Sequence, residues 1–177
     1  MTMLLSAFAV SASLLHLAPL KMPDTGVGLS KAHHAKGECS DFTGHWKGQC
    51  TNSDSQKGTN SDTVTIEQQG CDYISLESNT FSFGGAYTIG QTQASGFTYV
   101  GQAYVDWNAS LTGVHMRMGM TGRKLNEEVF VTVADVMDLT LVNGQLITKS
   151  KSLQTSDVSG RTSDSSYWEE CTYDKAD

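Results

Sequence analysis

Four methionines make up the group of side chains best suited to bind a ligand. Met116, Met118 and Met120 alternate with other residues, so a β-strand would place them on one face. Met137 follows in the next apolar segment. Because methionine is unbranched and polarizable, these side chains could line an adaptable pocket for an apolar molecule. Packing in an ordinary hydrophobic core is the alternative role.

Aromatic side chains form a second group with the same two possible roles. An aromatic wall whose tips carry polar atoms can orient a small molecule, whereas a core uses the same residues only for packing. A tryptophan near the start of the folded region would close one end of such an interior. The residues that we predict to bind a ligand are Trp46, Tyr87, Tyr99, Trp107, Met116 and Met118.

Catalytic and metal-binding patterns do not stand out in the sequence. Gly-x-Ser-x-Gly, His-Glu-x-x-His and phosphate-loop motifs do not occur. Glu169 and Glu170 are adjacent, so a strand would direct them to opposite faces. His115 and Asp106 could meet on neighbouring strands, but on the face opposite the methionines. We therefore expect no enzyme activity, no cofactor and no metal ion.

Composition limits the classes of partner. The chain has 177 residues, enough for one domain with a hydrophobic core. It has 12 Lys and Arg against 19 Asp and Glu, a formal net charge of -7. Nucleic acids and anionic membrane surfaces are bound by basic patches, so both are disfavoured as partners. Two prolines against 17 glycines favour many short strands joined by turns.

The first 38 residues differ in character from the rest. Residues 1–18 form an apolar run, too short for a comfortable membrane span, that is typical of a secretory signal peptide. An ordered arm that packs on the domain or on a neighbour is the alternative. Residues 19–38 have the composition of a linker, and residues 39–177 are expected to form a single domain. We predict a secreted or periplasmic protein without a membrane span in its mature form.

Period-two alternation predicts strands from residue 40 onward. We expect a bulge at Gly70, a break or bend at Gly84-Gly85, a hairpin at Asn143-Gly144 and a polar loop over residues 155–166. Residues 127–141 could open as a short helix, although alternating valines favour a strand. The expected fold is an all-β, antiparallel up-and-down barrel of about eight strands. The segments expected to be extended are 42–50, 63–77, 80–91, 97–109, 113–120, 127–141, 145–150 and 167–175.

Three short segments carry a resemblance to a known group of barrels. CSDFTGHW at residues 39–46 is similar to the first strand of avidins, and its Gly-x-Trp pair is shared with lipocalins and related calycin barrels. GAYT at 85–88 and VDWN at 105–108 also resemble avidin strands, in the same order. The resemblance implies an eight-stranded barrel with a ligand cavity at its mouth. It also implies that the strands holding Tyr87 and Trp107 contribute to the pocket.

Departures from these families argue against biotin as the ligand. Gly48 and Ile89 stand where avidins have polar residues near the ligand. The arginine that lipocalins place over the first-strand tryptophan is absent from residues 167–175. The barrel is therefore a firmer expectation than any particular ligand.

Four cysteines, at positions 39, 50, 71 and 171, lack the C-x-x-C spacing of zinc or redox sites. Two structural disulfides are the simplest interpretation, and three pairings are possible. In a closed barrel the last strand pairs with the first, which brings Cys50 to Cys171. The open end of the first hairpin then holds the other two cysteines. We predict the disulfides Cys39–Cys71 and Cys50–Cys171.

Two functions from different classes fit these features. The first is a secreted barrel that binds a small hydrophobic or amphipathic molecule in its interior. The second is a structural or interaction protein, such as an extracellular assembly subunit or an inhibitor, that acts through its surface or its N-terminal arm. Homo-oligomers are compatible with both. A barrel enzyme is a third and weaker hypothesis, because it needs a buried polar residue on the inward face, and the sequence shows no obvious one.

Overall fold

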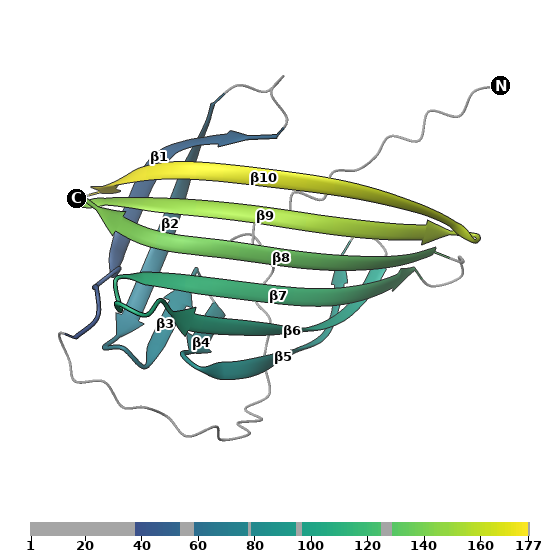
Figure 1. The fold of residues 1–177 in the computed structure, drawn as a ribbon, viewed down its shortest axis with the longest axis horizontal. Coiled ribbons are helices and arrows are strands. Elements are labelled where there is room, and N and C mark those ends of the chain that lie inside the picture. Colours follow the sequence, from purple (N-terminus) through teal and green to yellow (C-terminus); the bar gives the residue numbers. More distant parts are fainter. Residues whose placement is uncertain (1–37, 54–58, 78, 95–96, 125–128, 177) are drawn as a thin grey trace.

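Alternation of apolar and polar residues produces ten strands in the computed structural model (Figure 1). The structure describes residues 38–53, 59–77, 79–94, 97–124 and 129–176, and for residues 87–94 only the main chain. The segment resembling a signal peptide and nearly all of the expected linker lie outside these residues. The strands are β1 Gly44–Asn52, β2 Asn60–Gln69, β3 Tyr73–Leu76, β4 Asn79–Ser82, β5 Gly85–Ala94, β6 Phe97–Trp107, β7 Gly113–Lys124, β8 Val129–Val142, β9 Gln145–Val158 and β10 Arg161–Ala176.

All ten strands belong to one antiparallel sheet that curves into a nearly closed barrel. The spatial order is β4-β3-β2-β1-β10-β9-β8-β7-β6-β5, so β1 pairs with both β2 and β10. The edge strands β4 and β5 are consecutive in the chain. Between them, the Phe83 N–H donates to the Asp72 carbonyl, and the Gly84 N–H donates to the Val105 carbonyl, both at 2.9 Å. The expected all-β, up-and-down antiparallel class is confirmed.

The expected count of about eight strands was wrong because two glycines form turns. The chain reverses at Gly70, which has a φ of +58°, so that β2 and β3 pair in antiparallel fashion. The expected bulge there is therefore a hairpin turn. At Gly84, with a φ of +69°, the chain leaves β4 and starts β5 at the opposite edge of the sheet.

The expected polar loop over residues 155–166 was also wrong. β9 continues to Val158 and β10 begins at Arg161, with a two-residue turn at Ser159-Gly160, where φ is +52° and +79°. The segment lacks apolar alternation because both of its faces reach water, and a polar segment without alternation has the same sequence pattern as a loop. The hairpin at Asn143-Gly144 is confirmed, with φ values of +53° and +83°.

Both predicted disulfides are present in the structure. Cys39 is bonded to Cys71 beside the turn between β2 and β3. Cys50 of β1 is bonded to Cys171 of β10, directly opposite it in register, with Cα atoms 4.0 Å apart. Both cysteines of the second bridge are buried. This bridge joins the first and last strands of the barrel.

A buried hydrogen bond supports the same seam. Tyr173 of β10 is fully buried, and its O–H donates to Asp62 Oδ2 of β2 at 2.8 Å. Burial, together with the Asp62 carboxylate, raises the pKa of Tyr173 far above its usual value, so the phenol stays protonated. The bond therefore links two strands that lie on either side of β1.

The first prediction concerns this bond. Tyr173→Phe should lower the free energy of unfolding by about 1.5–3 kcal/mol, because it leaves a half-buried carboxylate without its donor. Tyr104→Phe is the control, since its O–H donates to Gln102 Oε1 on the exposed face, and it should change stability by less than about 0.5 kcal/mol. Urea denaturation measures both values. Equal losses in the two variants would contradict the assigned role of Tyr173.

Candidate functional site

The inner face of β7–β10 combines an apolar wall with a polar wall. Figure 1 shows these strands extending well beyond β1–β4, which gather at one end of the sheet. Alternation of side chains gives each strand an inner and an outer face. Within the described residues, the inner face changes from apolar on β7 to polar on β9 beyond Thr148 and on β10 before Cys171.

The methionines form the apolar side, here called the methionine wall. On β7, Met116, Met118 and Met120 are buried, while the residues between them face outward and are exposed. Met137 of β8 lies opposite Met116 in register and is buried as well. The methionine face expected from the sequence therefore exists and points inward.

Hydroxyl, amide and carboxylate side chains form the adjoining side, here called the polar wall. These residues are half-buried on inner positions, so water reaches this part of the interior. The Tyr167 O–H donates to Glu169 Oε2 at 2.9 Å, which holds both side chains on this wall. The members of the polar wall are Ser150, Ser152, Gln154 and Ser156 of β9 with Tyr167 and Glu169 of β10.

Asp135 of β8 lies where the two walls meet. In register it has Met118 of β7 on one side and Ser152 of β9 on the other. Its exposed fraction is 4%. Among the described residues, neither carboxylate oxygen has a hydrogen-bond partner. A buried polar group normally has a partner, so this carboxyl is the most unusual group on the inner face.

Burial raises the pKa of the Asp135 carboxyl, because water no longer stabilises its charged form. The neighbouring Ser152 hydroxyl lowers the pKa in part, although its geometry falls short of a hydrogen bond to either oxygen. The carboxylate therefore destabilises the folded state wherever it is ionised.

The second prediction is a pH dependence of stability. Between the unfolded-chain pKa of about 4 and the raised pKa of the folded state, the folded state binds more protons, so the contribution of Asp135 to stability falls as pH rises through that window. Asp135→Asn should remove this fall and raise stability at pH 7 by about 1 kcal/mol or more. Asp164→Asn, at an exposed position, is the control and should keep the wild-type slope. Urea denaturation from pH 4 to 8 measures the slopes; an unchanged slope in Asp135→Asn would contradict the prediction.

Two of the predicted aromatic residues pack at the end of the barrel near the Cys39–Cys71 bridge. Trp46 is buried, and its Nε1–H donates to the Phe42 carbonyl at 2.9 Å. Trp107 is half-buried, its Nε1–H donates to the Cys71 carbonyl at 2.9 Å, and its ring stacks on Phe83 with centroids 4.4 Å apart. Lys175 Nζ of β10 lies 5.6 Å from the centroid of the Trp46 ring, which is close enough for a cation–π interaction.

The predicted tyrosines lie elsewhere along the interior. Tyr99 is buried, and its ring covers the main chain at Gly122, where a Cβ atom would overlap it. The main chain of Tyr87 pairs with Ala103 of β6, and its side chain lies outside the described part of the structure. Among the predicted residues whose side chains the structure describes, only Met116 and Met118 adjoin the junction of the two walls at Asp135.

No protein-family model and no curated protein matches this chain. Function is therefore inferred from the walls and from Asp135.

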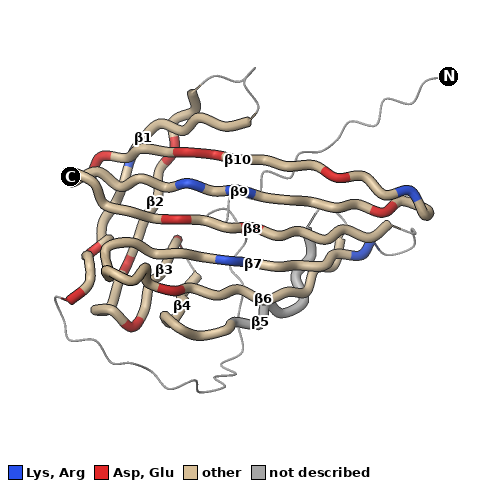
Figure 2. The backbone as a smooth tube through the Cα atoms, in the orientation of Figure 1, with Lys and Arg blue, Asp and Glu red and all other residues tan. Residues whose placement is uncertain are grey.

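The outer face of the same strands is a solvated face with interstrand ion pairs. Figure 2 shows acidic and basic positions on neighbouring strands from β6 to β10. His115 lies opposite Asp106 in register, as expected, but their side chains bind other partners: His115 Nδ1 lies 2.6 Å from Asp138 Oδ1, and Arg117 binds Asp106 at 3.1 Å. The prediction that His115 and Asp106 lie outside the methionine face is confirmed.

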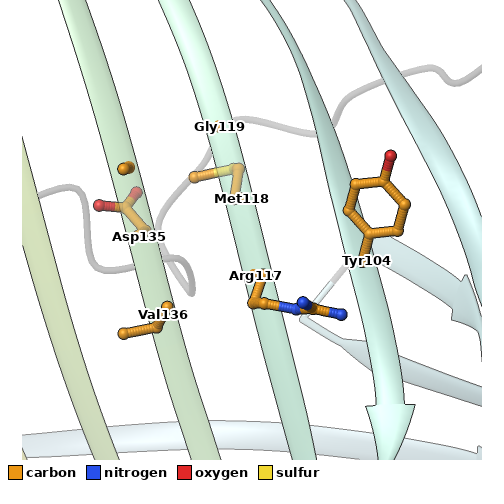
Figure 3. A pocket seen from close by; sticks show the side chains of 7 residues that line it. Tyr104, Arg117, Met118, Gly119, Asp135 and Val136 are labelled. Carbon is orange, nitrogen blue, oxygen red and sulfur yellow. The ribbon is translucent and has the colours of Figure 1, made fainter.

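A shallow depression of about 340 Å³ lies on this outer face, over Gly119 (Figure 3). Tyr104, Arg117 and Val136 border it with exposed side chains. Met118 and Asp135 also border it, although strand alternation directs their side chains to the inner face. It is therefore separate from the inner site.

Metal binding finds no support in the one cluster of potential ligands among the described residues. Cys50, Cys171 and Asp62 bring their ligand atoms within 4.8 Å of one another. The two sulfurs are bonded to each other, and Asp62 accepts the Tyr173 hydrogen bond.

Within the described ranges, no helix has the length and apolar character needed to cross a membrane.

Sequence reasoning missed Asp135 and the polar wall. The sequence did contain a signal for Asp135, because in a strand it lies on the same face as Val133 and Met137. Inward-facing apolar neighbours at both i−2 and i+2 place an aspartate inside a strand's buried face. The serines of β9 gave no comparable signal, because their segment was interpreted in part as a loop.

Proposed function

We propose that this protein is a secreted or periplasmic barrel that binds a small amphipathic molecule on its inner face. The observation that supports this most strongly is Asp135, a buried carboxyl without a partner, placed where an apolar wall meets a polar one. An amphipathic ligand would lay its apolar part along the methionine wall and its polar part along the polar wall. Two disulfides support an oxidising compartment outside the cytosol.

A bound ligand accounts for the buried carboxyl and the methionines better than an ordinary hydrophobic core does. A carboxylate in an apolar core destabilises the fold, and residues that do so are often kept for binding or catalysis. Methionine surfaces adjust to irregular ligands, and the side chains of the polar wall are only half-buried.

The test is a fluorescence titration with N-phenyl-1-naphthylamine, a neutral apolar probe. We expect saturable binding with one probe per chain. Ser152→Trp, which places a bulky ring on the inner face beside Asp135, should weaken binding at least tenfold. Lys151→Trp is the matched control, because this residue is adjacent on β9 but faces outward, and it should bind as the wild type does. Absence of saturable binding, or equal weakening in both variants, would overturn the proposal.

Self-association through the outer face is a second candidate function, favoured by exposed apolar side chains. Leu153 and Trp168 are 51% and 48% exposed. On β9, Lys151 lies in register between Val136 of β8 and Trp168 of β10, and Leu153 is two residues further along the same face. Clustered apolar side chains on a surface often mark a contact with another protein, here a second copy of the chain. Sedimentation velocity over a range of concentrations should then show a dimer that Trp168→Ser abolishes. A monomer at every concentration would exclude this candidate.

A further inference from the structure

The inner carboxyl group lacks the donor that its chemistry requires. An ionised carboxylate accepts up to four hydrogen bonds, yet both oxygens of Asp135 have none among the described residues. Leaving such a group buried and unpaired destabilises the fold, and a positively charged donor would stabilise it most. The missing partner is therefore expected to come from a ligand.

No basic side chain of the described strands around Asp135 occupies the inner face beside it. Arg117 and Lys151 are close in register, but alternation places both on the outer face, and Arg117 already binds Asp106. The inner neighbours are Met118 and Ser152, of which only Ser152 carries a hydroxyl. The described inner face thus holds a carboxyl without a counterion.

The other charged group on the polar wall has the same sign. Glu169 lies on β10, two strands from Asp135, and accepts a hydrogen bond from Tyr167. A ligand carboxylate or phosphate would meet repulsion from both acids, and neither acid could donate to it when ionised. A ligand cation would meet attraction from both.

We propose that the interior selects amphipathic ligands that carry a primary ammonium group, which Asp135 binds. This inference rests on the proposed function. An ammonium group has three N–H donors, enough to reach both oxygens of Asp135 and a hydroxyl of the polar wall, such as that of Ser152. The alkyl part of the ligand packs against Met118 and its neighbours on the methionine wall.

The experiment compares three ligands that share one tail and differ in the head group. Octylamine, octanol and octanoate compete with bound N-phenyl-1-naphthylamine at pH 7. We expect octylamine to displace the probe at a concentration at least tenfold below that of octanol, and octanoate to be the weakest. In Asp135→Asn the preference for octylamine over octanol should fall to less than threefold.

Matched variants separate a direct role of the carboxylate from a change in fold. Asp138→Asn removes an acid three residues along the same strand but on the outer face, and should keep the full preference. Asp135→Ser serves as a second removal of the charge, and near-UV circular dichroism checks the fold of each variant. A preference that survives in both Asp135 variants would overturn the inference.

The outcomes also distinguish this inference from the proposed function. If the probe binds and octylamine shows no advantage, the amine inference is wrong while the interior still binds ligands. If the probe does not bind, octylamine is titrated directly by calorimetry. Absence of heat there overturns both, and binding that Asp135→Asn abolishes supports the amine inference without the probe.

Discussion

Replacing Cys50 and Cys171 together by alanine is expected to lower the free energy of unfolding by about 4–5 kcal/mol. The bridge closes a loop between residues 121 positions apart, so its removal releases a large conformational entropy in the unfolded chain. Small domains have only about 5–15 kcal/mol of stability in total. The variant should therefore be partly unfolded at 37 °C, as measured by thermal and urea denaturation followed by circular dichroism.

The second disulfide provides the comparison. Cys39→Ala with Cys71→Ala opens a loop of only 32 positions and should lower stability by about 3–4 kcal/mol. The two losses differ because loop-closure entropy grows slowly with loop length. A smaller loss for the Cys50–Cys171 pair than for the Cys39–Cys71 pair would contradict this account of the seam.

Gly48→Ala is expected to be the most damaging single substitution, with a loss of about 3 kcal/mol or more. A Cβ atom at position 48 would overlap the carbonyl oxygen of Thr172 and lie 2.7 Å from the Cα of Tyr173. Both atoms belong to the main chain of β10, which cannot move aside as a side chain could. The substitution would force β1 and β10 apart beside the disulfide that joins them.

Gly119→Ala is the matched control for this substitution. Gly119 also lies within a strand, but a Cβ atom there would meet nothing within 4 Å. Alanine at that position should leave stability unchanged or raise it slightly, since glycine weakens a strand interior. Urea denaturation of both variants measures the difference; similar losses would show that close approach of β10 is not the reason for Gly48.

Much of the barrel could be predicted because its signals are local. Alternation around Met116 and Met118 identified β7, and Asn143-Gly144 identified the turn between β8 and β9. The disulfide pairing followed from one assumption, that the last strand of a barrel lies beside the first. The confirmed bridge between Cys50 and Cys171 shows that this assumption was sound.

The errors arose where polar residues occupy strands. Alternation identifies a strand only when its two faces differ in polarity, and residues Ser163 to Ser166 are exposed on every side. The same difficulty concealed the polar wall on β9. Asp135 was missed for a different reason, because an acidic side chain by itself predicts an exposed position, whereas here its apolar neighbours on the same face are buried. The candidate site could be recognised only from the strand register, which brings Met118, Asp135 and Ser152 side by side although they are far apart in the sequence.

The order of the strands has a consequence for how the chain reaches its fold. Register partners in other neighbouring pairs are close in sequence, such as Val129 and Val158 of β8 and β9, whereas β1 must find β10 across 121 positions. His45 of β1 lies opposite Ala176 of β10, so the two ends of the barrel domain are neighbours in space. A circular permutant that joins these ends and opens between β4 and β5 would make every strand pair a sequential one. Its lower contact order should let it fold faster than the natural connectivity, because the one long-range pairing becomes a hairpin.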